Sequence, residues 1–268
     1  MRAFPSVTAF LLLAASGALG AQRPDQPTLV LTIFGGATTG NDLWTVAQQP
    51  LCVLEGTGCS ANDDTLRLVR KVNSSLVLGL SAEYYPRAAV GLYGEIVYLG
   101  LGLDDTCSAP AFRDQRNADL CANVSAAAGT GSGIAFLAGA TVRPPRAASV
   151  TPYVRLGGGV LGYGTSTVEV AGTYVESGLG PRTREVIRGP KGGSATPVVL
   201  AAMGLTAGSG SGYRLRVEAR DVYTGFRTVT APANRQGLGA TSETRFFHFV
   251  GLIIGLDIVL EQKRGRRY

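Results

Sequence analysis

The chain has 268 residues, of which 45% are apolar and 16% are charged, and its 25 lysines and arginines exceed its 19 acidic residues by six. Such an apolar composition with so small a net charge excludes an intrinsically disordered chain. The excess of six is too small to indicate a nucleic-acid-binding protein. The chain contains a single histidine, His248, so a metal site built on two histidines is excluded. We therefore expect no nucleic-acid partner, no metal and no cofactor.

The first 20 residues have the layout of a secretory signal peptide. Arg2 provides a positive start, an apolar run follows at residues 10–15, and Ala18 and Gly20 place small residues before a cut ahead of Ala21. The apolar run is too short to cross a bilayer of roughly 30 Å as a helix. We therefore predict that residues 1–20 are a signal peptide and that residues 21–268 form a single domain.

The rest of the chain predicts strands rather than helices. Eight segments alternate with a period of two and are rich in β-branched, aromatic and glycine residues. These segments are Thr28–Gly36, Ser74–Tyr85, Ala88–Leu103, Ser132–Arg143, Val150–Gly162, Thr196–Thr206, Tyr213–Tyr223 and Arg245–Leu260. We find no convincing amphipathic helix of three turns, and Leu66–Lys71 is too short to count as one. The expected fold class is therefore all-β.

The connections between these segments alternate strictly between short and long. The short ones, at residues 86–87, 144–146 and 208–212, contain proline or a glycine–serine run, which is typical of turns. The long ones are Ala37–Asn73, Asp104–Gly131, Tyr163–Ala195 and Thr224–Thr244. Short turns on one rim and long loops on the other are typical of outer-membrane barrels. We predict an eight-stranded antiparallel up-and-down transmembrane β-barrel over residues 28–260, followed by a basic tail at 261–268.

The two faces of the predicted strands differ in chemistry. One face is apolar enough for lipid, whereas the other carries four acids and four bases. These eight residues are Glu83, Glu95, Arg155, Arg214, Arg216, Glu218, Arg220 and Asp257. Eight strands enclose an interior that side chains just fill, and charges buried there must pair. We therefore predict a lumen plugged by ion pairs. The alternative is a secreted soluble β-barrel that binds an apolar ligand and turns its charges outward.

Together, the signal peptide, the eight strands, the short turns and the long loops resemble the small OmpA/OmpX-type outer-membrane β-barrels. The resemblance is architectural and covers residues 28–260. It implies the outer membrane of a Gram-negative-type bacterium, with membrane lipid as the partner and a non-catalytic structural or surface-interaction role. We also expect a monomer. Such barrels usually end on an aromatic residue in the last strand, whereas here that strand ends near Leu260 and a basic segment separates it from Tyr268.

The four cysteines lie in two of the long loops, Cys52 and Cys59 in the first and Cys107 and Cys121 in the second. Four cysteines allow three pairings. The pairing within each loop needs the shortest closures, and the periplasm is oxidising enough to form both bonds. We therefore predict the disulfides Cys52–Cys59 and Cys107–Cys121.

His248 is the one residue that could act as a histidine base. By parity it shares a face with Val250 and Leu252 near the outer end of the last strand, beside Phe246 and Phe247. Amphipathic rings favour the membrane interface, so we interpret His248 as a residue of an aromatic girdle. The alternative, a barrel enzyme that acts on lipid, requires a partner for His248, and no serine occupies the neighbouring position on the same face.

The third long loop contains four bases, Arg182, Arg184, Arg188 and Lys191. Bases that point outward can bind the phosphates of lipopolysaccharide through charge-assisted hydrogen bonds. The simpler interpretation is a solvated loop whose bases face acids of the same loop, such as Glu176 and Glu185.

Overall fold

The computed structural model describes residues 27–53, 64–127, 129–145, 149–164, 166–176, 178–189, 194–208 and 212–261. The predicted signal peptide and the residues of the tail after Glu261 lie outside these ranges. Both therefore stay predictions.

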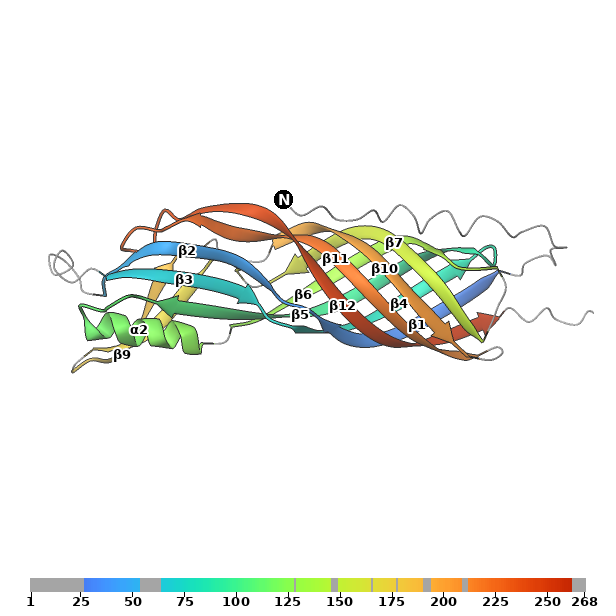
Figure 1. Ribbon diagram of the computed structural model, residues 1–268, viewed down its shortest axis with the longest axis horizontal. Helices are drawn as coiled ribbons and strands as arrows, with labels where there is room; N and C mark the ends of the chain where they lie inside the picture. The colour runs from blue at the N-terminus through green and yellow to red at the C-terminus, as the bar shows by residue number, and fades with distance from the viewer. Residues whose placement is uncertain are drawn as a thin grey trace, which may run out of the picture.

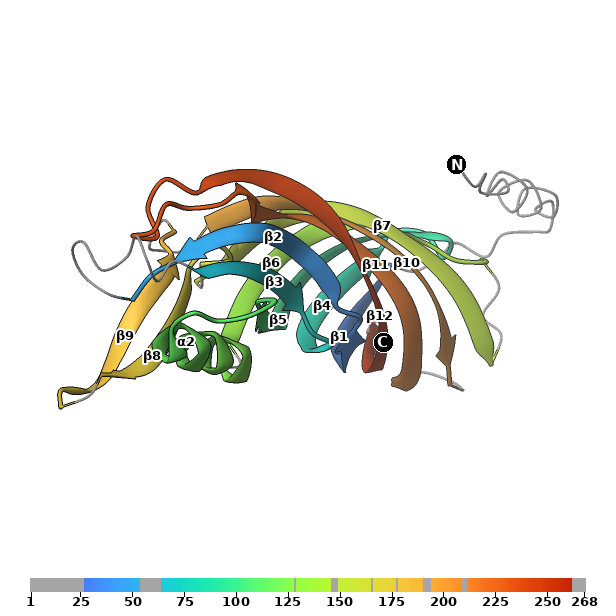
Figure 2. The ribbon, with the colours of Figure 1, turned by 60° about the vertical axis from the view of Figure 1, so that its left-hand side comes forward.

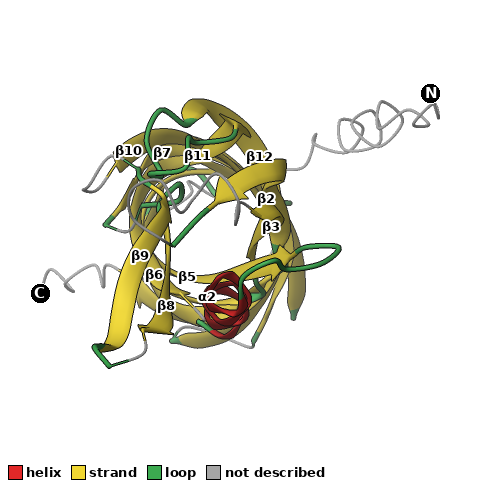
Figure 3. Cartoon of the chain, turned by 90° about the vertical axis from the view of Figure 1, so that its left-hand side faces the viewer, coloured by secondary structure: helices red, strands yellow, loops and turns green. Residues whose placement is uncertain are grey.

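Eight antiparallel strands close a barrel (Figure 1). They are β1 (Thr28–Thr38), β4 (Ser75–Tyr85), β5 (Val90–Ser108), β6 (Gly129–Val142), β7 (Val150–Tyr163), β10 (Ser194–Ala207), β11 (Tyr213–Ala231) and β12 (Thr241–Glu261). Each strand pairs with the next one in this order, and the pairing of β1 with β12 completes the ring, which Figure 3 shows end-on. The predicted eight-stranded all-β barrel is confirmed, as is the architecture that the resemblance implied.

Three strands are much longer than a bilayer requires. β5 and β11 each have 19 residues and β12 has 21. Apart from Glu261, the residues that these strands add to the predicted segments lie at the end opposite the short turns. A transmembrane strand needs about 9–11 residues. The barrel wall therefore continues beyond the thickness of a bilayer at that end. We call it the loop end, and we call the opposite end, with the short connections at 86–89 and 143–149, the turn end.

The long connections contain further elements at the loop end, as Figure 2 shows. β2 (Asn41–Leu51) pairs with β3 (Asp64–Val72), and β3 pairs with the last residues of β5. β8 (Val170–Glu176) and β9 (Gly180–Ile187) form a separate hairpin. We call this group, together with the helix described next, the loop-end module. The segment Leu66–Lys71 belongs to β3.

The expectation that the chain contains no three-turn helix is wrong, because α2 (Gln115–Ala126) has 12 residues. Its buried positions, Asn117, Leu120, Cys121 and Val124, follow the spacing of one helix face. Asp114 caps the helix by accepting a hydrogen bond from the amide of Arg116. In the described part of the chain, no helix is long and apolar enough to cross a membrane.

The outward positions of the barrel strands form an apolar belt. Large apolar side chains on the outside include Leu31, Ile33, Leu76, Leu80, Leu92, Ile96, Phe136, Leu156, Val199, Met203, Leu215, Leu252 and Ile254, all exposed. A soluble barrel would turn these apolar side chains inward and its charged side chains outward. The strands do the reverse. The structure is therefore a membrane barrel, and the alternative of a secreted soluble barrel is wrong.

Candidate functional site in the barrel interior

The inward positions near the turn end bring seven buried charged side chains together. We call them the lumen charge cluster: Glu83 on β4, Glu95 on β5, Arg155 on β7, Arg216, Glu218 and Arg220 on β11, and Asp257 on β12. None of the seven is more than 3% exposed. Alternation along each strand explains this placement, because residues two apart point to the same side of a sheet.

Arg155 lies at the centre of the cluster. Its Nη2 is 2.8 Å from Oε2 of Glu95, and its Nη1 is 3.2 Å from Oε2 of Glu218. Its Nε is 3.7 Å from Oε1 of Glu83. One arginine therefore joins acids from three different strands, β4, β5 and β11.

The other two arginines also bridge acids, and Arg216 lies 3.9 Å from Glu218 in addition to the pairs given next. Nη1 of Arg220 is 3.0 Å from Oε1 of Glu95, and its Nη2 is 2.7 Å from Oε1 of Glu218. Nη1 of Arg216 is 2.5 Å from Oε1 of Glu83, and its Nε is 2.8 Å from Oδ1 of Asp257. The ion pairs therefore run without a break from Asp257 across the lumen to Glu95.

Neutral donors complete the hydrogen bonding of three acids. Tyr153 donates to Glu218 at 2.8 Å, Tyr85 donates to Glu83 at 2.6 Å, and Thr32 donates to Asp257 at 2.8 Å. Such partners offset the cost of taking carboxylates out of water.

Glycines make room for the tyrosines of the cluster. A Cβ on Gly204 would lie 2.5 Å from the hydroxyl oxygen of Tyr153, and a Cβ on Gly157 would lie 2.1 Å from that of Tyr93. Both distances are far below van der Waals contact, so any larger residue at these two positions would displace a ring. The guanidinium carbon of Arg155 lies 3.9 Å from the ring centre of Tyr93, which is a cation–π distance. Gly157 therefore indirectly fixes the position of the central arginine.

Arg214 is the one predicted lumen residue that lies outside the cluster. It is partly buried near the turn end, and it forms no ion pair with any acid in the described ranges. The remaining set contains three arginines and four acids, so its formal charge is 3 − 4 = −1 when every group is ionised. The sequence predicted four acids and four bases in the lumen. One of those bases, Arg214, lies outside the cluster.

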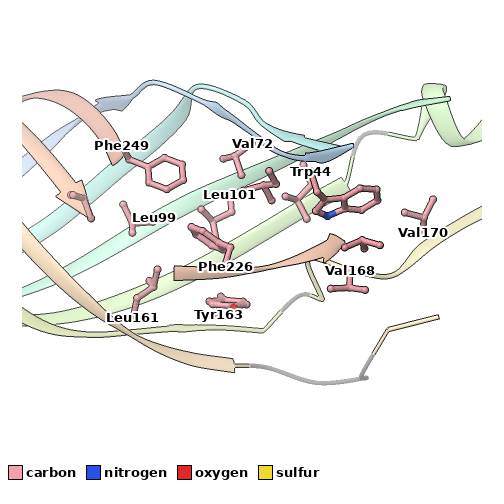
Figure 4. Packing of buried hydrophobic residues seen from close by; sticks show 14 of the residues in the cluster. Trp44, Val72, Leu99, Leu101, Leu161, Tyr163, Val168, Val170, Phe226 and Phe249 are labelled. Atoms are coloured by element: carbon pink, nitrogen blue, oxygen red, sulfur yellow. The ribbon is translucent and has the colours of Figure 1, made fainter. Parts of the chain in front are cut away.

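Beyond the cluster, toward the loop end, the same inward parity becomes apolar. Figure 4 shows Leu99 and Leu101 of β5, Leu161 of β7, Phe226 of β11 and Phe249 of β12 packed against one another. The ring centres of Phe226 and Phe249 are 5.5 Å apart. This apolar half of the lumen was not predicted. The signal for it is that residues 96–101 are apolar or glycine on both parities, which a strand with a water-filled side would not need.

Two small cavities lie in the described part of the lumen. One is in the apolar half, beside Leu161 and Phe226, and the other is beside Leu137 and Arg220, and each has a volume of about 10 Å³. A volume of that size accommodates about one water molecule.

Polar contacts join the parts of the loop-end module to one another, and a disulfide ties the module to the barrel. Asp64 of β3 accepts a hydrogen bond from the amide of Arg113 at 2.9 Å and from Nδ2 of Asn117 at 2.7 Å. The predicted disulfide Cys107–Cys121 is confirmed and ties α2 to the end of β5. Cys52 is disulfide-bonded, but Cys59 lies outside the described residues, so the pairing Cys52–Cys59 stays a prediction.

Three bases of the third long loop, which contains β8 and β9, have partners within the protein. Arg182 lies 3.5 Å from Glu176, and Arg188 lies 2.5 Å from Glu185. Arg184 donates to the backbone oxygen of Arg235 at 3.4 Å. Lys191, the fourth base predicted to face phosphates, lies outside the described residues. The contacts of Arg182 and Arg188 favour the simpler interpretation, in which bases of the loop pair with acids of the same loop.

His248 points outward, as the parity predicted, and it has a partner that the sequence did not reveal. Its Nδ1 is 2.8 Å from Oδ2 of Asp221, the residue that faces Val250 on the neighbouring strand β11. Its ring centre lies 4.6 Å from that of Tyr223. Within the described ranges, no three or more His, Cys, Asp and Glu side chains are grouped so as to hold a metal ion.

The comparisons with known proteins concern only the arrangement of strands. No family model matches the chain. No curated protein matches it. Among solved structures, it is similar to Neisserial surface protein A, with 9% identity over 86% of this chain and 96% of that one and a TM-score of 0.43. It is also similar to the outer membrane protein OprG from Pseudomonas aeruginosa, with 10% identity, 89% and 98% coverage and a TM-score of 0.45. A third similar structure is the attachment invasion locus protein Ail of Yersinia pestis, with 8% identity, 88% and 99% coverage and a TM-score of 0.38.

Proposed function

We propose that this protein is a non-conducting barrel of the outer membrane of a Gram-negative-type bacterium, with a structural or surface-interaction role and without catalysis. The observation that carries this proposal is the filled interior. Ion pairs occupy the turn half of the lumen, and packed apolar side chains occupy the loop half. An interior filled in this way leaves no continuous path for ions across the bilayer.

The outer surface supports the location. The apolar belt is bordered by Tyr84 and Tyr213 near the turn end and by Tyr223 and Phe246 toward the loop end, and all four rings are exposed. Aromatic residues of this kind favour the interface between acyl chains and headgroups. The disulfide Cys107–Cys121 at the loop end fits an oxidising compartment.

Planar-bilayer recording tests the closed lumen. We expect little or no conductance from purified protein whose folding is verified by different gel migration of boiled and unboiled samples. A large, stable conductance of the kind that porins give would contradict the proposal, because it requires an open path through both halves.

Labelling of intact cells tests which end faces outward. A cysteine introduced by Arg182→Cys, on the exposed part of β9, should react with a membrane-impermeant maleimide. A cysteine introduced by Arg87→Cys, at the turn end, should react only after the outer membrane is opened. Both side chains are exposed, so accessibility from outside the cell is what differs between the two variants. Equal labelling of both in intact cells would contradict the proposed location.

The absence of catalysis is tested on lipid. No serine or threonine in the described ranges forms a hydrogen bond with the ring of His248, whose recorded partner is the carboxylate of Asp221. We expect no fatty acid to be released when the folded barrel is incubated with lipid A or phospholipid vesicles. Release that His248→Gln abolishes would favour a lipid-hydrolysing enzyme instead.

A further inference from the structure

Two arginines lie on the inner side of the barrel at the turn end. Arg143 directly follows β6, and its guanidinium carbon lies 3.6 Å from the ring centre of Tyr85, which is buried inside the barrel. Arg214 lies on β11 and shares the inward parity of Arg216, a member of the lumen charge cluster. Both Arg143 and Arg214 are partly exposed, so they are accessible to solvent at this end.

Neither of these arginines forms an ion pair with an acid whose side chain the structure describes. Asp257, which faces Arg214 in the register, pairs with Arg216 instead. Burial lowers the pKa of the Arg143 guanidinium, and the positive charge of Arg214 lowers it further. The two cations are therefore close enough to repel each other.

The inward charges of the turn half do not balance. The lumen charge cluster has three arginines and four acids, and Arg143 and Arg214 add two cations, so the sum is 5 − 4 = +1. None of the described residues in the turn-end connections, at 86–89, 143–145, 149, 208 and 212, is acidic. Cations held together without a counter-charge attract an anion from solution.

Arg143 is held in position for a bidentate contact. Its Nε donates to the backbone oxygen of Ala88 at 2.8 Å, and its amide donates to the backbone oxygen of Ala89 at 2.9 Å. The ring of Tyr85 covers one face of the guanidinium. The edge formed by Nη1 and Nη2 has no hydrogen-bond acceptor among the described residues. Such an edge binds an oxyanion through two parallel hydrogen bonds.

We infer that Arg143 and Arg214 form a binding site for the phosphate group of a soluble molecule. The Nη edge of Arg143 donates to two phosphate oxygens, and the guanidinium of Arg214 donates to the others. In the ring of strands β7 and β10 separate β6 from β11, so the two arginines approach from different sides. A phosphate has oxygens in four directions and can accept from both, whereas the two oxygens of a carboxylate lie in one plane.

The source of the phosphate follows from the direction of the side chains. A phospholipid headgroup offers the same chemistry, but lipid covers the outer face of the barrel and both arginines belong to the inner one. A soluble phosphate-bearing molecule at the turn end has direct access to them. This inference goes beyond the proposed function and does not depend on it.

Melting-temperature measurements on the purified, folded barrel in an uncharged maltoside detergent test the site. Inorganic phosphate is the probe, and sodium chloride of equal ionic strength is the reference for general screening by salt. We expect phosphate to raise the melting temperature, because a ligand that binds only the folded state stabilises it. Arg143→Gln and Arg214→Gln should each weaken phosphate binding roughly ten- to hundredfold, the range for losing hydrogen bonds between charged groups.

Arg227→Gln is the matched control, because it removes the same charge from an exposed position at the loop end. It should bind phosphate like the parent. Without phosphate, Arg214→Gln should be at least as stable as the parent, because it removes a like charge beside Arg143. A loss of stability in that variant without phosphate would show instead that Arg214 supports the fold. If Arg143→Gln does not fold, Arg214→Gln decides alone.

Vesicles of phosphatidylcholine with and without phosphatidylglycerol provide the second probe. Stabilisation by phosphatidylglycerol that Arg214→Gln abolishes, without any stabilisation by inorganic phosphate, would assign the site to a lipid headgroup and overturn a soluble occupant. Equal stabilisation of the parent and both variants by phosphate, or none beyond that of chloride, would overturn the site. Porin-like conductance would refute the proposed function but not this inference, which the phosphate titration decides.

Discussion

The two halves of the lumen are closed in different ways by the same strands. On β5, the next inward residues after Glu95 are Val97 and Leu99. On β11, the next inward residue after Arg220 is Val222. The turn half depends on a few specific pairs of charges, whereas the loop half depends on many interchangeable apolar contacts. A buried charge that loses its partner stays uncompensated, whereas the cavity left by a truncated apolar side chain can be reduced when its neighbours relax into it. The turn half should therefore be the less tolerant of substitution.

The largest effect should come from breaking the turn half. Glu218→Gln takes away a carboxylate that pairs with both Arg155 and Arg220, so we expect a loss of about 3–5 kcal/mol in the free energy of unfolding. Urea titration of the barrel folded in lipid vesicles measures it. Glu185→Gln, which breaks the exposed pair with Arg188, should cost far less. Similar costs for the two variants would show that breaking a lumen pair is no more costly than breaking an exposed pair.

The loop half is tested by making a cavity. Leu161 is fully buried, and Leu161→Ala should lower the free energy of unfolding by about 2–5 kcal/mol. Leu156→Ala, on the same strand but 62% exposed on the outside, is the matched control. In the same urea titration, an equal loss for both would indicate that the loop half is not packed as described.

A third variant contrasts the lumen with the outer face. Ile254 points outward near the middle of the apolar run of β12, one residue from the inward Ile253, which is fully buried. Ile254→Arg should cost about 2–4 kcal/mol, and Leu260→Arg, at the rim, about 0–1 kcal/mol. Folding into lipid vesicles at graded urea concentrations separates the two. Equal costs at both depths would argue against lipid on this face.

The smallest effect concerns the loop-end module. Asp114 caps α2, and Asp114→Ala should destabilise that helix by about 1 kcal/mol. The hydrogen bond from the Arg116 side chain lowers the pKa of the Asp114 carboxyl. Its contribution is therefore complete above the unfolded pKa, near 4, and is lost as the pH falls through the lowered value in the folded protein. Hydrogen exchange of the α2 amides should rise in the variant while the barrel amides stay protected. Faster exchange throughout the barrel would contradict local capping.

The sequence predicted the barrel well because lipid enforces a strict alternation along each transmembrane strand. The loop-end module lies outside the lipid, where that constraint does not act. Its elements were therefore predicted less well than the barrel strands. β3 alternates buried Leu66 and Leu68 with exposed Arg67, so its signal was present, but its length and charge obscured it. α2 has few large apolar residues, and the disulfide of Cys121 supplies part of what holds it.

Side-chain partners were harder to predict than strands. Alternation assigned Glu95, Arg155 and Glu218 to one face, but only the register between strands shows which of them meet. Arg214 has the same parity as Arg216 and faces Asp257 in the register, yet the carboxylate of Asp257 pairs with Arg216, two residues along β11. Asp221 and His248 are 27 residues apart in the chain and become neighbours only through the pairing of β11 with β12.

The distribution of the lumen charge cluster along the chain has a consequence for the order of folding. Arg216 on β11 pairs with Asp257 on the neighbouring strand β12, but its other acid, Glu83, lies on β4, 133 positions away and across the junction of β1 with β12. Contacts of such separation form late, because the cost of closing a long loop comes first. Until β12 pairs with β1, Arg216 lacks Glu83 as a partner. The cluster should therefore disfavour a barrel that is not closed between β1 and β12.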